Sequence, residues 1–195
     1  MSALRRRDVV RRLLAERGDL LVVAGLGSTA WDCTAAGDHP LTFPLWGAMG
    51  LAAMTGLGLA LAQPGRRVLV VTGDGELLMG LGSLATIAVQ RPANLSVVVI
   101  DNERYGETGM QETHTAHGVD LAAMARGAGF ASAVLVRDAQ AIEGLRQSVH
   151  RAPGPHFAQI KVAAEKESVV LPPREGALLK SRFRDALLGA SARLQ

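Results

Sequence analysis

The chain has 195 residues, of which 48% are hydrophobic and 20% are charged, with a formal net charge of +3. This composition argues against a disordered chain and suits one α/β domain, so we expect residues 1–195 to form a single domain. Aromatic residues make up only 4%, which argues against a stacking surface for single-stranded nucleic acid. The lone cysteine, Cys33, excludes an internal disulfide and a cysteine-built zinc or iron–sulfur centre within this chain.

Nucleic-acid and membrane partners receive little support from the sequence. Six arginines lie between Arg5 and Arg17 beside acidic residues, a pattern typical of an exposed helix face rather than of a nucleic-acid patch. Neither a cationic leader with a cleavage site nor an unbroken apolar run of membrane-spanning length is evident. We therefore expect a cytoplasmic protein that binds no membrane and no nucleic acid.

Helical patterns and apolar runs alternate along the chain. We expect helices over residues 4–17, 47–62, 81–90, 120–127, 139–150 and 175–190, and strands over residues 20–24, 68–72, 95–100, 130–136 and 156–162. Residues 25–44 and 103–118 are rich in glycine or polar residues and predict loops. The alternation predicts an α/β fold with a doubly wound, mostly parallel sheet and helices on both faces.

Three unusual loops each follow a predicted strand, at Gly25–Thr29, Gly73–Glu76 and Asp101–Asn102. Because parallel strands place their carboxyl ends at one edge of the sheet, these loops are expected to meet there and to form a ligand site.

The first loop has two interpretations besides ordinary turn chemistry. Gly25–Ala30 matches the dinucleotide pattern G-x-G-x-x-A, but Leu45 and Trp46 stand where an acidic residue is expected about 20 residues later. An NAD site is therefore the weaker alternative. The hydroxyl groups of Ser28 and Thr29 would instead suit a phosphate.

The second loop places an acid where an anion is expected. Gly73 and Gly75 allow backbone N–H groups to approach an anion at a helix start, whereas Asp74 between them would repel it. A divalent cation between carboxylate and anion resolves the conflict. Mg²⁺ prefers oxygen ligands and shares them with phosphates, and Asn102 offers an amide oxygen nearby. For Gly73–Gly75 taken alone, a simple helix cap by Asp74 is the plainer alternative.

The spacing of these residues resembles that of a known family motif. Gly73-Asp74-Gly75, followed after 25 residues by Asp101-Asn102, resembles the diphosphate-and-magnesium motif of thiamine-diphosphate enzymes. Gly47–Gly50 looks like the segment that holds the aminopyrimidine ring in that family. The stretch Asp101–His114 is similar to the sulfopyruvate and phosphonopyruvate decarboxylase branch, as is Gly118–Ala122. The resemblance extends over about residues 20–162.

The resemblance implies thiamine diphosphate and Mg²⁺ as cofactors. The metal ligands implied are the side chains of Asp74 and Asn102 and the carbonyl of Arg104. Asp101 departs from the family pattern, which has Asn at that place, but the metal-binding Asn is the second one.

The organic cofactor would be held by backbone groups and one apolar wedge. The resemblance implies diphosphate contacts from the N–H groups of Gly75 and Glu76, a bond from the 4′-amino group to the Gly47 carbonyl, and Met49 as the wedge. The full set of implied cofactor-binding residues is Ser28, Thr29, Gly47, Met49, Gly73, Asp74, Gly75, Glu76, Asn102, Tyr105 and Gly106.

Enzymes of this family place the cofactor between two α/β domains, and the second domain supplies a Glu to the pyrimidine ring. This chain resembles only the diphosphate-binding half. The resemblance therefore implies a β-type subunit that pairs with a separate pyrimidine-binding α-type subunit carrying that Glu, in a hetero-oligomer or a homodimer of such pairs.

The implied reaction is the non-oxidative decarboxylation of an anionic 2-oxo acid. His114 and His117 are the candidate catalytic residues for proton transfer, with a plain role as surface-loop histidines as the alternative. Three other functions stay open: half of an acetolactate-synthase-like carboligase, a subunit of a 2-oxo acid:ferredoxin oxidoreductase, and a non-catalytic partner that keeps the fold.

Overall fold

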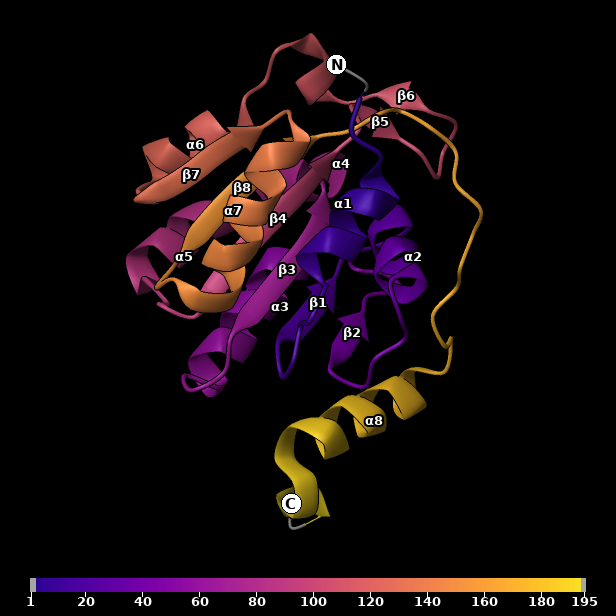
Figure 1. Cartoon of the computed structure of the whole chain (residues 1–195), viewed down its shortest axis with the longest axis vertical. Helices are drawn as coiled ribbons and strands as arrows, with labels where there is room; N and C mark the ends of the chain where they lie inside the picture. The colour runs from indigo at the N-terminus through magenta and orange to yellow at the C-terminus, as the bar shows by residue number, and fades with distance from the viewer. Residues whose placement is uncertain (1–2, 194–195) are drawn as a thin grey trace.

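The computed structural model describes residues 3–193, and its centre is a six-stranded parallel sheet with the strand order β2-β1-β3-β4-β8-β7 (Figure 1). The strands are β1 (Leu21–Ala24), β2 (Thr42–Pro44), β3 (Val68–Gly73), β4 (Leu95–Asp101), β7 (Ser132–Val136) and β8 (His156–Lys161). The predicted parallel α/β sheet is confirmed.

Helices connect these strands. They are α1 (Arg6–Leu13), α2 (Ser28–Ala35), α3 (Ala52–Ala62), α4 (Asp74–Met79), α5 (Ser83–Gln90), α6 (Leu121–Ala128), α7 (Ala139–Arg151) and α8 (Gly176–Leu188), with 3₁₀ turns η1 (His114–His117) and η2 (Gly189–Arg193). Among the described residues, 3–193, none of these helices is long and apolar enough to cross a membrane.

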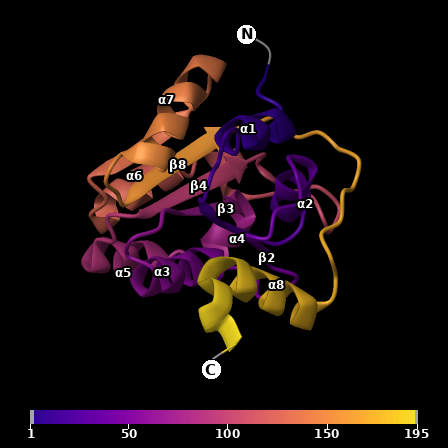
Figure 2. The same ribbon diagram turned by 60° about the horizontal axis from the view of Figure 1, so that its bottom comes forward.

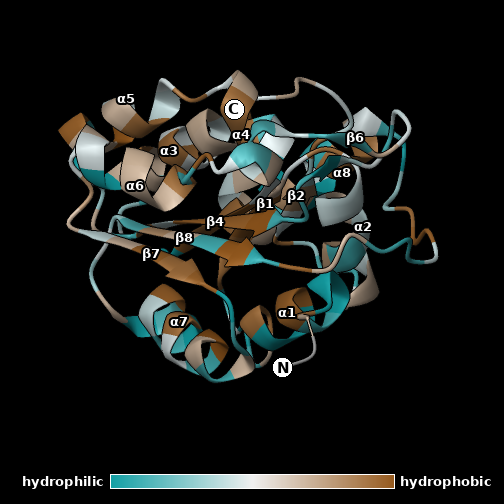
Figure 3. Ribbon diagram, turned by 90° about the horizontal axis from the view of Figure 1, so that it is seen from above, coloured by the Kyte–Doolittle hydropathy of each residue, from teal (hydrophilic) through white to brown (hydrophobic). Residues whose placement is uncertain are grey.

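The central strands are buried on both faces, and successive residues alternate between two cores. Val70 and Val97 pack in the core beneath α3, α5 and α6. Their neighbours Leu69 and Val98 pack in the core beneath α1, α2 and α7. The two helical layers lie on opposite sides of the apolar sheet (Figure 3). This arrangement leaves the carboxyl ends of β1, β3 and β4 free to present their loops.

Two helices stand where loops were expected. The glycines and polar residues of residues 25–44 led us to expect a loop, but α2 begins directly after Gly27 and buries Asp32 against Arg6 and Arg7 of α1. The charge compensation explains a buried acid that no hydrophobic pattern could indicate. Likewise α4 begins at Asp74, within the predicted Gly-rich loop.

The segment before α3 differs from the prediction. The expected helix over residues 47–62 begins only at Ala52, because Ala48 and Gly50 adopt positive φ angles of 60° and 96°. Residues 45–51 therefore form a turn that leads from β2 toward the sheet edge. A further correction concerns residues 103–118, where the loop contains a two-stranded hairpin, β5 (Arg104–Tyr105) with β6 (Gln111–Glu112), before η1.

The C-terminal part of the chain wraps the sheet edge. After β8, residues 162–175 run in extended form along one side of the molecule, and α8 then packs beside β2 (Figures 1 and 2). The ring of Phe183 meets that of Phe43 edge-on at 5.5 Å, and the Trp46 indole N–H donates to the Pro173 carbonyl at 2.8 Å. These contacts hold the C-terminal segment against the turn that follows β2.

Candidate cofactor site

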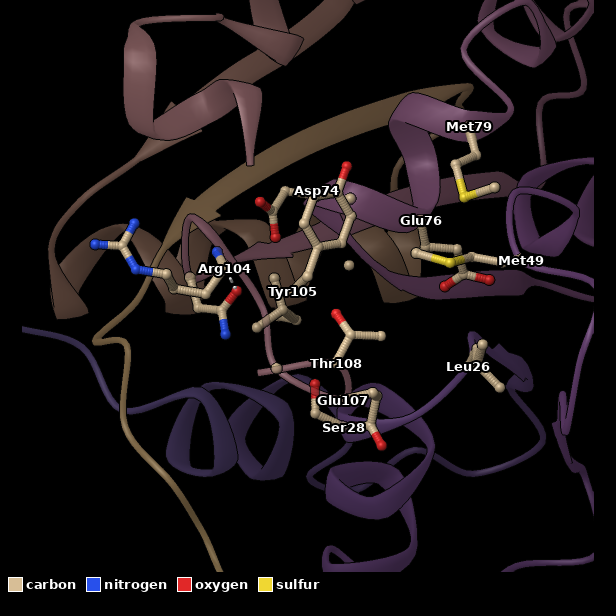
Figure 4. Close-up of a pocket in the computed structure, with 15 residues that line it drawn as sticks. Leu26, Ser28, Met49, Asp74, Glu76, Met79, Arg104, Tyr105, Glu107 and Thr108 are labelled. Carbon is tan, nitrogen blue, oxygen red and sulfur yellow. Dashed lines mark hydrogen bonds between the residues drawn. The ribbon is translucent and has the colours of Figure 1, made fainter. Parts of the chain in front are cut away.

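A pocket of about 320 Å³ lies at the carboxyl ends of β1, β3 and β4, where the three loops were expected to meet. Figure 4 shows Leu26, Met49 and Met79 gathered on one side of it, and Ser28, Asp74 and Arg104 on the other. Its lining residues are Leu26, Ser28, Met49, Gly73, Asp74, Gly75, Glu76, Met79, Ile100, Asn102, Arg104, Tyr105, Gly106, Glu107 and Thr108. The pocket therefore has an apolar side and a polar side.

The hairpin β5–β6 closes one wall of the pocket. The Tyr105 ring lies directly against Gly75, where a Cβ atom would stand 2.3 Å from ring carbon Cε1. Only glycine leaves room for the ring at this place, and the ring covers the start of α4 where a Cβ atom would stand. The glycine after Asp74 is thus needed for the packing of the hairpin.

Asp74 lies on the polar side in a buried position. Its Oδ2 atom accepts hydrogen bonds from the hydroxyl groups of Thr113 and of Thr115, the latter at 3.1 Å. The two hydroxyl oxygens are 2.9 Å apart. Both threonines are buried at η1, so the loop after the hairpin folds back to hold the Asp74 carboxylate from behind.

Asp101 is the second carboxylate of this region, and it faces away from the pocket. It accepts from Gln159 Nε2 at 2.6 Å and pairs with Lys161 Nζ at 2.8 Å. Thr115 also donates to Asp101, at 2.8 Å. Asp101 therefore belongs to a buried polar network between β4, β8 and η1. An acid in place of the family's Asn at residue 101 is therefore explained by its contacts with Gln159 and Lys161 of β8.

The ionised form of Asp74 is energetically unfavourable in the folded chain. Burial, and then the negative charge of Asp101, raise the pKa of Asp74 from 3.8 to about 6, against the opposing hydrogen bonds of Thr113 and Thr115. Lys161 pairs with Asp101, whereas within residues 3–193 no Lys, Arg or His forms an ion pair with Asp74. A cation at this place would relieve that cost.

Glu76 lines the pocket next to Met49 (Figure 4). Its side chain is buried, and Oε2 accepts from the Thr72 hydroxyl at 2.7 Å. Oε1 is buried without a hydrogen-bond partner among the described residues. Burial raises the pKa of Glu76, against the hydrogen bond of Thr72 and nearby backbone N–H groups. The side chain thus has an unused acceptor beside Met49, on the apolar side of the pocket.

The apolar side is built where two turns touch. A Cβ atom on Gly80 would stand 1.9 Å from the carbonyl oxygen of Gly50, so the turn before α3 and the end of α4 are in direct backbone contact. This contact sets Met49 and Met79 on the same wall. Gly47 lies in the same turn, is exposed and does not line the pocket.

Oxygen atoms suited to a metal are present on the polar side. Asn102 lines the pocket, and its Oδ1 accepts the backbone N–H of Arg104 at 3.1 Å, which fixes the amide. The Arg104 guanidinium instead reaches Glu112 on the hairpin, at 3.2 Å. Within residues 3–193, no three His, Cys, Asp or Glu side chains converge on a metal site. The implied set of one carboxylate, one amide and one carbonyl is of a different kind, and it stays a prediction.

Besides Gly47, three implied residues lie outside the pocket: Thr29, His114 and His117. The Thr29 hydroxyl donates to the Gly25 carbonyl at 2.9 Å, within its own helix start, rather than facing a ligand. His114 is exposed on η1, and His117 is exposed and pairs with Glu112 at 3.2 Å. In this chain the two histidines therefore do not face the pocket directly.

Sequence reasoning missed Thr113 and Thr115, the residues that contact Asp74, and the pocket residue Met79. The threonines flank His114, the residue of this stretch whose imidazole suggests proton transfer. No spacing rule connects a threonine to a carboxylate 39 residues earlier.

Comparison with known proteins identifies the family of the chain. Residues 27–162 match the family described as "Thiamine pyrophosphate enzyme, C-terminal TPP binding domain", and the chain belongs to that family. It is similar to the sulfopyruvate decarboxylase subunit beta of Methanothermobacter thermautotrophicus, with 36% identity over 188 residues that cover 96% of this chain and 98% of the relative.

Two further similarities extend this result. The phosphonopyruvate decarboxylase of Streptomyces viridochromogenes is 44% identical over 122 residues, which cover 62% of this chain and 30% of that protein. A solved structure described as a thiamin diphosphate-dependent enzyme from Mycobacterium smegmatis superposes with a TM-score of 0.69 at 22% identity, covering 85% of this chain and 32% of the other. The last similarity confirms the predicted fold.

Proposed function

We propose that the chain is the diphosphate-binding subunit of a two-chain, thiamine-diphosphate- and Mg²⁺-dependent decarboxylase that acts on an anionic 2-oxo acid of the sulfopyruvate or phosphonopyruvate type. The observation that carries the proposal is the placement of Asp74, Gly75 and Asn102 around one pocket at the sheet edge. Membership of the thiamine pyrophosphate enzyme family and the names of the similar relatives support it.

The polar side of the pocket fits a metal-bound diphosphate. Asp74 and Asn102 provide oxygen atoms of the kind that Mg²⁺ prefers, and the Arg104 carbonyl is the proposed third protein ligand. Ser28 and the backbone N–H groups of Gly75 and Glu76 at the start of α4 would hold the diphosphate. The buried carboxylate of Asp74, which no Lys, Arg or His of residues 3–193 pairs with, is the structural feature that a metal would satisfy.

The apolar side fits the rings of the cofactor. Leu26, Met49 and Met79 would pack against them and exclude water from the reacting centre. Thiamine diphosphate, when bound, supplies the electron-accepting ring that makes the loss of CO₂ possible. Met49 would set the bent shape of the cofactor, with the Gly47 carbonyl at its pyrimidine end.

A partner chain is part of the proposal. The similar sulfopyruvate decarboxylase subunit beta is matched over 98% of its length, whereas the similar phosphonopyruvate decarboxylase is matched over only 30%. We take residues 1–195 as one diphosphate-binding unit, with an α-type subunit supplying the Glu for the pyrimidine. Leu51, at the N-cap of α3, and Met54 and Leu61 on α3 form an exposed apolar stripe, three and seven residues apart on one helix face, where such a subunit would pack. Met79, also exposed, contacts Gly50 just before this stripe.

His114 and His117 stay predictions for the proton-transfer group. Both are exposed at η1 and outside the pocket, so a catalytic role for them would belong to the assembled enzyme.

Release of CO₂ tests the proposal. The chain, the α-type chain and their mixture would each be assayed with sulfopyruvate, phosphonopyruvate and pyruvate in the presence of thiamine diphosphate and Mg²⁺. We expect turnover only in the mixture, and only with an acid that carries a second anionic group. Full turnover by the chain alone would refute the two-chain proposal. Carboligation products in place of the aldehyde would favour the acetolactate-synthase-like alternative.

A further inference from the structure

The polar network behind the pocket connects Asp74 to β8 through η1. Lys161 contacts Asp101, and also reaches the Thr115 carbonyl at 3.4 Å. Asp101 and Asp74 share the Thr115 hydroxyl as a donor, at 2.8 and 3.1 Å. Thr113 completes the hydrogen-bond network by donating to Asp74. The Asp74 carboxylate is thus held by a loop that is 39 residues away in sequence and anchored on the last strand of the central sheet.

The number of hydroxyl protons determines which carboxylate each threonine donates to. Each hydroxyl has one proton to donate. The shorter contact gives the Thr115 proton mainly to Asp101, so Thr113 is the principal donor to Asp74. Both hydroxyls approach the same oxygen, Oδ2 of Asp74. Within residues 3–193 no side chain donates to Oδ1, and the other hydrogen bond to the carboxylate comes from the backbone N–H of Asp74 itself. Oδ1 is therefore the oxygen to which a ligand in the pocket has access.

We propose that Thr113 and Thr115 are positioning residues that hold Asp74 Oδ2 and thereby direct Oδ1 toward the metal, with Asp101 and Lys161 as their fixed support. The inference rests on the proposed function, because it gives Asp74 a metal to bind. It assigns a role to two buried hydroxyl groups that the predicted ligand set does not include. Hydrogen bonds to a metal ligand commonly fix its orientation and tune its affinity.

The experiment compares Mg²⁺ dependence among variants of the full chain. Binding of thiamine diphosphate would be followed at increasing Mg²⁺ by tryptophan fluorescence, and the unfolding temperature of each variant would be measured in parallel. Thr113→Val removes the hydroxyl and keeps the shape. We expect it to raise the half-saturating Mg²⁺ concentration by about 10- to 100-fold. Thr113→Ser, which keeps the hydroxyl, should restore most of the affinity.

Thr115→Val should have a smaller effect on Mg²⁺, because its proton serves mainly Asp101. Thr42→Val is the matched control: Thr42 is a buried threonine of β2 whose hydroxyl binds Arg17 at 2.6 Å, outside the pocket. It should lower the unfolding temperature and leave the Mg²⁺ dependence unchanged. Thr113→Ala repeats the test with a second variant that lacks the hydroxyl.

The outcomes separate the two proposals. If the wild-type chain binds thiamine diphosphate without any dependence on Mg²⁺, the proposed function fails. If the wild type depends on Mg²⁺ but Thr113→Val and Thr113→Ala have its half-saturating concentration, the positioning role is refuted while the function stands. A lower unfolding temperature without a change in Mg²⁺ dependence would show that the threonines contribute to stability alone.

Discussion

The ring of Tyr105 packs directly against Gly75, and a methyl group at residue 75 would overlap that ring. Gly75→Ala should therefore push the β5–β6 hairpin outward and destabilise the chain by about 1–3 kcal/mol. Gly73→Ala is the matched control, because a Cβ atom at Gly73 meets no atom within 4 Å. Urea unfolding of the ligand-free variants checks the difference. Equal stabilities for the two variants would show that the hairpin yields without cost.

Asp74 should make the ligand-free chain less stable as the pH rises. Its pKa is higher in the folded chain, at about 6, than the ordinary 3.8, so the folded state binds the extra proton between these values. The favourable contribution is complete below pH 3.8 and is lost as the pH rises through 6. The loss corresponds to about 3 kcal/mol.

Asp74→Asn should remove this dependence. We expect the ligand-free variant to match the wild type near pH 4 and to be more stable at pH 7, although it loses Mg²⁺-dependent cofactor binding. Unfolding by urea across this range is the measurement, with Asp19→Asn, an exposed acid on the opposite end of β1, as the control. A pH profile for Asp74→Asn that coincides with that of the wild type would place the perturbed carboxyl elsewhere.

Met54 lies in the exposed apolar stripe of α3. Met54→Glu should prevent assembly with the α-type chain, because a charge would be buried in the interface, while the isolated chain keeps its stability. Met124→Glu on α6 is a close control, since the two methionines are 37% and 39% exposed. Size-exclusion chromatography of the mixed chains distinguishes them. Assembly of the Met54→Glu chain at the wild-type affinity would show that the partner binds another face.

His114 tests the remaining catalytic prediction. If it handles protons in the assembled enzyme, His114→Ala should lower kcat by about 10²-fold or more and leave cofactor binding unchanged. His150, which contacts the Leu13 carbonyl at 2.9 Å far from the pocket, provides the control variant His150→Ala. Wild-type turnover by His114→Ala would make it an ordinary surface residue.

Much of the fold follows from the sequence because the central strands are continuous apolar runs. Residues 95–100 could belong only to a buried strand, and the parallel order then brings three loops to one edge. The metal site could be predicted for the same reason, since Asp74 and Asn102 each come directly after such a strand. The pocket does contain both residues, and their role as ligands stays a prediction.

What the sequence did not reveal depends on contacts between distant segments. Helix α2 is stabilised by the pairing of Asp32 with Arg6 and Arg7, which has no local pattern. The turn before α3 follows from the positive φ angles of Ala48 and Gly50, although the small residues there suit a helix. The threonines behind Asp74 lie in a polar loop without periodicity, so only the folded chain relates them to the site.

The most direct test of the account is a calorimetric titration of the full chain, alone and with its α-type partner, using thiamine diphosphate with and without Mg²⁺. We expect binding that requires Mg²⁺, is strongest with the partner, and is lost in Asp74→Ala. Binding that ignores the metal and survives Asp74→Ala, or tight binding of NAD in its place, would contradict the account.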